Sequence, residues 1–187
     1  MSTIITPYLA WHHPEQWLDV TPPLTSGSYH RTPALLDQVL DQFDVEHAQR
    51  YLPSGRITWC NLYASDVTRA AGCPLPRVLL VGPAWQELSA NRLWEWLTGE
   101  CVELPRAYRH SAAQAGWRLA TREAAEAEAR AGRVAVAVAH NAVGSGHIAI
   151  FRPGGGIAQA GAANRARCTL EEGFGHLARS ARFVSHP

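Results

Sequence analysis

The sequence contains no lysine, no long apolar run and almost no excess of one charge. All 17 basic residues are arginine, a bias that is typical of GC-rich genes and assigns no function. Against 16 acidic residues they leave a formal net charge of only +1. Such a balance gives no basic field for a nucleic acid or a membrane surface. We therefore expect neither of them as a partner.

The longest apolar stretch runs only from Val134 to Ala139. A membrane-spanning helix needs about 20 apolar residues, so no membrane insertion is expected. The first residues, MSTIITPYLAWHHPEQW, lack the basic start and apolar centre of a secretory signal. We expect synthesis in the cytoplasm without a signal peptide. Another compartment would then be reached through lysis, a secretion machine or a virion.

Cysteine is scarce, and its spacing excludes several kinds of site. There is no C-x-x-C pair and no H-E-x-x-H motif, so neither a redox centre nor a metal site is predicted, and no cofactor is implied. A zinc site on the nine histidines remains an alternative. Each cysteine is by default a small buried hydrophobe. The four are Cys60, Cys73, Cys101 and Cys168.

What is present is a chain of 187 residues, 47% of them apolar, which can bury one core. We expect a single catalytic domain over residues 1–187. Residues 1–31 form an irregular extension, because prolines and a Thr-Ser-Gly-Ser run interrupt any helix there. Trp11, Trp17 and Tyr29 are candidates for packing this extension on the body.

Four N-cap signals predict four helices in the first two thirds of the chain. The caps are Thr32, Thr58, Ser89 and Thr121. The first helix should continue past Phe43 to a Pro-Ser-Gly stop at 53–55. Glycines at 72, 99 and 132 should end the other three.

Beyond residue 132 the pattern changes to strands. Val134, Val136 and Val138 alternate with alanine, which predicts a half-buried strand. Further strands are expected over 146–152, 157–160 and 182–186. Helices first and antiparallel strands last indicate an α+β domain, with N-terminal helices packed on a C-terminal antiparallel sheet.

Cys60 has the best setting for a nucleophile. With Thr58 as N-cap, Cys60 takes the second position of its helix. Backbone N–H groups there have no intrahelical partner, and the helix dipole is positive, so the thiolate should be favoured. The N–H of Cys60 itself is placed to hold an oxyanion.

A thiol nucleophile needs a base and a group that orients the base. His147 follows a flexible Gly-Ser-Gly turn and begins a predicted strand. Gln159 lies twelve residues further on, in the next strand, where it could pair laterally with His147 and fix the ring tautomer. His140 is the alternative base.

The segments TWCNLYASDVTRAAGCPLP and SGHIAIFRP resemble the NlpC-type and CHAP-type cell-wall hydrolases, including their lysin-like members. That resemblance implies a papain-like fold with a Cys-His-polar triad, onto which Cys60, His147 and Gln159 fall. The sequence departs from the usual pattern in having Trp-Cys-Asn where Asp-Cys-Ser is common. The third residue is often His, Asn or Glu, which leaves Asn164 as an alternative to Gln159.

Three residues near the motifs are candidates for substrate binding, namely Trp59, Asn61 and Asn164. Asn61 could contact substrate, brace the loop before the histidine strand or cap its own helix. Asp66 lies deeper in the same helix, where a buried contact to an arginine is expected.

These features together predict a cysteine hydrolase that cleaves amide bonds of bacterial peptidoglycan, as an endopeptidase or amidase. It would act in the periplasm or at the cell wall. An immunity protein is an expected partner if the protein is a secreted effector. The alternatives are an acyltransferase or protease on the same fold, and a non-catalytic binding module.

Overall fold

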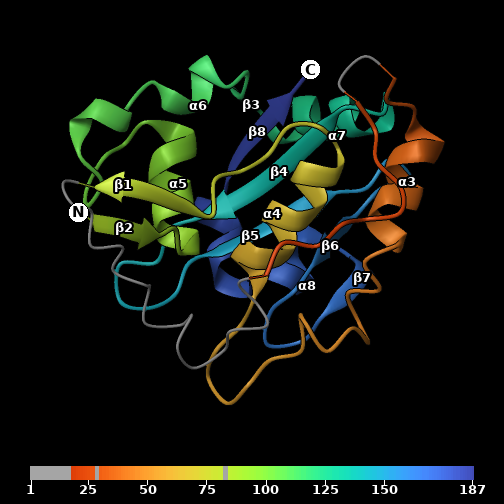
Figure 1. The fold of residues 1–187 in the computed structure, drawn as a ribbon, viewed down its shortest axis with the longest axis horizontal. Coiled ribbons are helices and arrows are strands. Elements are labelled where there is room, and N and C mark those ends of the chain that lie inside the picture. The colour runs from red at the N-terminus through yellow and green to blue at the C-terminus, as the bar shows by residue number, and fades with distance from the viewer. Residues whose placement is uncertain (1–17, 28–29, 82–83) are drawn as a thin grey trace.

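The structure is a computed structural model that describes residues 18–27, 30–81 and 84–187 (Figure 1). Trp11, Trp17 and Tyr29 lie outside these residues. Residues 18–27 form neither helix nor strand and contact the body through hydrogen bonds. The N–H of Ser26 donates to the Ala70 carbonyl at 2.8 Å, and the Gln42 side chain bonds both main-chain groups of Leu24.

Helix α3 (Pro33–Asp41) begins where the sequence predicts, and the Thr32 hydroxyl accepts from the N–H of Leu35. Its predicted continuation to about residue 52 is wrong. The chain leaves the helix after Asp41 and turns at Asp44, which adopts a left-handed φ of 41°. Residues 44–51 then form successive turns.

Helix α4 (Cys60–Ala70) starts later than expected, and Thr58 is not its N-cap. The cap position belongs to Trp59, which makes no side-chain cap bond. Reciprocal main-chain bonds of 3.0 Å between Ser54 and Ile57 hold the preceding chain in a tight turn. The buried Trp59 indole also donates to the Leu52 carbonyl at 3.1 Å. Cys60 is therefore the first helical residue.

Two later helices confirm their predicted caps. Helix α5 (Ala90–Thr98) starts at Ser89 and ends at Gly99, whose φ of 74° is a left-handed stop. Helix α7 (Arg122–Arg130) is capped by Thr121, which accepts from the N–H of Ala124. The sequence did not predict the short α6 (Ser111–Gln114), α8 (Leu170–Phe174), η1 (Arg106–Tyr108) and η2 (Gly175–Ser180).

The main sheet is antiparallel throughout, in the order β3-β8-β4-β5-β6-β7. The four inner strands of the sheet confirm the strands predicted from the sequence, whereas neither edge strand was predicted. The strands are β3 (Arg118–Ala120), β4 (Val134–Ala139), β5 (His147–Phe151), β6 (Ile157–Gln159), β7 (Arg165–Cys168) and β8 (Arg182–His186). This mixture of helices and antiparallel sheet is an α+β fold.

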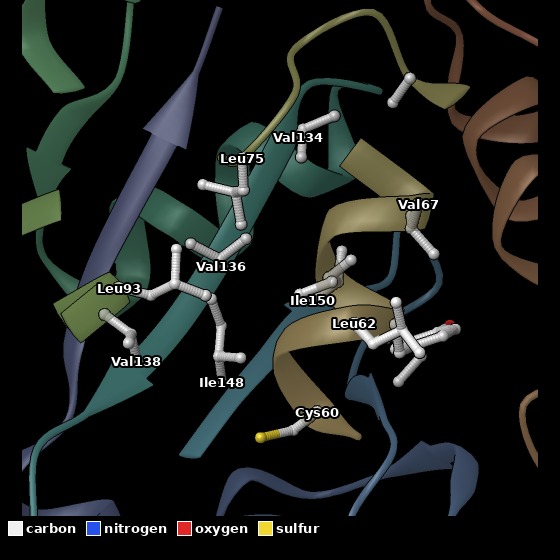
Figure 2. Packing of buried hydrophobic residues seen from close by; sticks show 14 of the residues in the cluster. Cys60, Leu62, Val67, Leu75, Leu93, Val134, Val136, Val138, Ile148 and Ile150 are labelled. Atoms are coloured by element: carbon white, nitrogen blue, oxygen red, sulfur yellow. The ribbon is translucent and has the colours of Figure 1, made fainter. Parts of the chain in front are cut away.

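The prediction that β4 is half-buried is wrong, because both of its faces are covered. Its valines join Ile148 and Ile150 in a core under α4 and α5, as Figure 2 shows. Its alanines meet Ala125 and Ala129 of α7 on the opposite face. The sheet is thus a middle layer, and alanine lets α7 approach it closely.

A separate hairpin of β1 (Val78–Val81) and β2 (Ala84–Glu87) precedes α5 and was not predicted (Figure 1). This hairpin is not part of the main sheet, and it lies beside the start of α5. None of the helices within the described ranges is long and apolar enough to cross a membrane.

A candidate active site at the start of helix α4

A cleft of about 580 Å³ opens at the start of α4. One wall is the turn before α4 together with Cys60. The facing wall is made by the end of β2, the start of α5 and the loop that precedes β5. Its lining includes Trp59, Cys60, Asn61, Trp85, Glu87, Asn91 and Gly146.

The Cys60 side chain lines this cleft and is only 5% exposed. Figure 2 shows its sulfur at the end of α4, directed away from the helix on the side of Ile148. Burial raises the pKa of the Cys60 thiol to about 11, although N–H groups of Ile148, Asn61 and Cys60 itself act to lower it. The expected thiolate is therefore corrected to a neutral thiol, because loss of hydration outweighs the helix terminus.

His147 is the first residue of β5 and pairs with Ala139 of β4. Its ring packs edge-on against Phe174 of α8, with centroids 4.7 Å apart. Burial lowers the pKa of His147 to about 4, and the interaction with Gln159 opposes this by raising it. The resting imidazole is therefore neutral at pH 7.

Gln159 is buried in β6 and faces His147. Its Nε2 donates to the Ala163 carbonyl at 2.7 Å, which leaves Oε1 on the side of the imidazole. The Nε2 of His147 and the Oε1 of Gln159 are both buried, and within the described chain neither has a partner at normal hydrogen-bond geometry. The interaction between them is a loose one, with the amide oxygen as acceptor.

The strand register corrects the expectation of a lateral pair. Because Ile150 lies opposite Ala158, continuing the ladder brings Gly161, not Gln159, opposite His147. Gln159 is the diagonal neighbour on the same face, within reach of a long side chain. A Cβ on Gly161 would lie 2.7 Å from Gln159 Oε1 and 3.3 Å from His147 Cε1. Glycine is needed there for the pair to form.

The thiol and the imidazole both lie near the start of β5 but on opposite faces of it, and only Cys60 lines the cleft. Ile148 faces α4, whereas His147 faces the side on which α8 lies. Among the described residues no hydrogen bond joins Cys60 to His147. The link is the Ile148 N–H, the main-chain donor next to the histidine, which interacts with the Cys60 sulfur. The resting thiol and imidazole are thus both neutral and face opposite sides of β5.

The three candidates for substrate binding have different surroundings. Asn61 donates to Glu87 Oε1 at 3.1 Å and to the Leu88 carbonyl at 3.0 Å, so it braces the facing wall and not the histidine loop. Trp59 is buried but contributes to the lining of the cleft. Asn164 does not line the cleft; its amide donates to the main-chain carbonyls of Val45 and Tyr51, in the turns that follow α3, at 2.7 and 2.9 Å.

Asp66 makes the buried arginine contact that the sequence predicts. Arg50 Nε lies 2.7 Å from Asp66 Oδ2, which also accepts from the Tyr51 hydroxyl at 2.9 Å. This cluster ties the turns after α3 to α4 and therefore supports the helix that carries Cys60.

Sequence reasoning missed Asn91, which holds the loop before His147. Its Nδ2 donates to the carbonyls of Asn141 and Gly144 at 3.0 and 3.1 Å, and its Oδ1 accepts from the Asn141 N–H at 2.9 Å. A Cβ on Gly146 would lie 2.4 Å from Asn91 Oδ1. The only sequence feature that could have pointed to Asn91 is its position two residues after the Ser89 N-cap.

Within the described residues, no three histidine, cysteine or acidic side chains are grouped so that they could hold a metal ion. Comparison of the chain with protein-family models, curated proteins and solved structures finds no match.

Proposed function

We propose that the protein is a cysteine hydrolase of the papain-like kind that cleaves amide bonds in bacterial peptidoglycan. The observation that carries the proposal is the placement of Cys60. It is the first residue of α4, it lines a cleft, and its sulfur interacts with the N–H next to His147. A nucleophile at a helix start in a cleft, with a histidine and an amide close by in the fold, is the pattern expected of a thiol hydrolase.

In the proposed reaction, substrate binding swings the His147 ring around the start of β5 to the Cys60 thiol, because the resting ring packs on Phe174 and does not line the cleft. Catalytic hydrogen bonds often tighten in this way only in the complex. The thiol proton moves to His147 while sulfur attacks the amide carbonyl. The main-chain N–H of Cys60 stabilises the oxyanion. Carbon–nitrogen cleavage follows as His147 protonates the leaving amine, and a thioester remains.

Hydrolysis completes the cycle. His147 removes a proton from water as the water attacks the thioester, and the sulfur leaves and recovers that proton. The products are an amine and a carboxylic acid. An amine acceptor in place of water would give acyl transfer, and an acceptor-amine competition assay separates the two outcomes.

The choice of peptidoglycan as the proposed substrate rests on the resemblance of the Cys60 and His147 segments to cell-wall hydrolases. The cleft is compatible with it: an open groove of about 580 Å³ with Trp59 and Trp85 in its lining can accept a peptide beside a sugar. The proposed place of action is the periplasm or cell wall. Delivery as an effector would require an immunity protein in the producing cell.

Purified cell wall should be digested and its muropeptides analysed by mass spectrometry. We expect a single type of amide bond to be cut by the wild type, and cutting to fall below detection with Cys60→Ala. Cys73→Ala is the matched control, because Cys73 is also buried, lies just beyond the other end of α4 and does not line the cleft. Full activity of Cys60→Ala would contradict the proposal.

A further inference from the structure

Glu87, the last residue of β2, lines the same cleft as Cys60. Its Oε1 accepts from Asn61 Nδ2 at 3.1 Å, and Asn61 directly follows Cys60. The carboxylate is therefore separated from the nucleophile by a single side chain. Its second oxygen, Oε2, makes no hydrogen bond with the part of the chain that the structure describes.

The other charges along the cleft are arranged differently. Arg92 pairs with Glu103 at 3.2 Å and also donates to the Glu87 carbonyl at 3.3 Å. Burial raises the pKa of Glu87, whereas Asn61, Arg77 and Arg92 act to lower it. Arg56 is exposed in the turn before α4. Glu87 is half-buried, where a charge acts over a longer range than it does in water. Consistent with this, Glu87 contributes to raising the pKa of the Cys60 thiol.

We propose that Glu87 makes the cleft selective for substrates that carry a protonated amine close to the scissile amide. The inference rests on the proposed function, and it names the substrate class for that site. An ammonium group would bond the open Oε2 while Asn61 holds Oε1. Complementary charge of this kind discriminates between ligands more than it adds affinity.

The electrostatic effect of Glu87 on Cys60 can be measured without any hydrolysis of substrate. Two methanethiosulfonate reagents of similar size, one with a trimethylammonium group and one with a sulfonate, should be reacted with the wild type at pH 8.5. Trypsin then releases residues 57–69, a peptide whose only cysteine is Cys60. Because both reagents need the same thiolate, the ratio of their rates is independent of the pKa of Cys60.

We expect the wild type to favour the cationic reagent at Cys60. Glu87→Gln keeps an acceptor for Asn61 but removes the charge, and it should lower the ratio of rates about five- to tenfold. Glu100→Gln, the matched control, removes an exposed carboxylate that does not line the cleft and should change the ratio less than twofold. A ratio that is the same in wild type and Glu87→Gln, or one that falls equally in Glu100→Gln, overturns the inference.

Substrate selectivity is tested on peptides released from cell wall, before and after acetylation of their free amines. The wild type should cleave the untreated peptides about tenfold faster, and Glu87→Gln should remove most of that preference. Equal cleavage of both by the wild type would refute the role of Glu87 while leaving the hydrolase standing. Cleavage by Cys60→Ala would instead refute the proposed function.

Discussion

The wall of the cleft that carries Cys60 holds a buried thiol among main-chain N–H groups and has Arg56 as its charged residue, whereas the facing wall presents two carboxylates and an exposed tryptophan. Cys60 is 5% exposed and its sulfur meets N–H groups. Across the cleft, Trp85 is 42% exposed, and Glu87 and Glu103 also contribute to the lining.

This difference assigns different tasks to the two walls. In the proposed hydrolase, burial keeps the thiol and the imidazole neutral until a substrate arrives, so Cys60 and His147 would set the rate of the chemical step. The facing wall would hold the charges that distinguish one substrate from another. Changes at Cys60 and His147 should therefore alter the rate for every substrate, and changes in the facing wall should alter the preference among substrates.

The largest effect is expected for His147→Gln. Loss of the base should lower kcat/KM about 10²- to 10⁴-fold for every cleavable peptide, because proton transfer to a positioned side chain contributes a factor of this size. His140→Gln is the control, since the His140 ring packs on Trp94 with centroids 5.2 Å apart, whereas the His147 ring packs on Phe174 and interacts with Gln159. A similar loss in both variants would indicate that His147 has no special part in the reaction.

The buried wall also predicts how Cys60 responds to pH. With a pKa near 11 in place of 9.0, Cys60 should hold about a hundredfold less thiolate at pH 7 than an ordinary cysteine. Alkylation by iodoacetamide, followed on the peptide 57–69, should rise about tenfold per pH unit up to pH 10. A plateau below pH 8 would mean that the resting site is an ion pair.

The same shifts affect stability in a defined direction. Between pH 6.5 and 4, His147 takes up a proton in the unfolded chain but not in the folded one, so the free energy of unfolding falls as the pH falls. The loss is at most about 3 kcal/mol. In urea unfolding, the difference in the free energy of unfolding between wild type and His147→Gln should become smaller below pH 6.5. Above pH 9 the ionisation of unfolded Cys60 lowers stability as the pH rises.

Much of the framework around the cleft could be predicted from local sequence. The Ser89 and Thr121 caps, the alternating valines of β4 and the strand that begins at His147 are all set by residues close in the chain. The sign of the pKa shift at Cys60 could not be predicted from the sequence, because desolvation depends on what packs around the thiol. The Thr58 cap failed for a related reason: the burial of Trp59 decides where α4 starts.

The facing wall could not be predicted because its contacts are distant in the sequence. Asn91 bonds a loop fifty residues further along the chain, and Asn61 bonds Glu87 twenty-six residues away. The strands β1 and β2 have four residues each, too short for an alternating pattern to stand out. A polar residue on such a short strand has no signature in the sequence.

A smaller effect is expected at Gly161, where the chain after β6 passes beside the start of β5. Gly161→Ala puts a methyl group 2.7 Å from Gln159 Oε1, so the amide must move away from His147. We expect kcat/KM to fall about tenfold for all substrates, with the cation preference at Cys60 unchanged, because Glu87 lies on the facing wall of the cleft. Gly27→Ala is the matched control, since its Cβ would meet nothing within 4 Å. If Gly161→Ala altered the ratio of reagent rates as much as Glu87→Gln does, the division of tasks between the walls would be wrong.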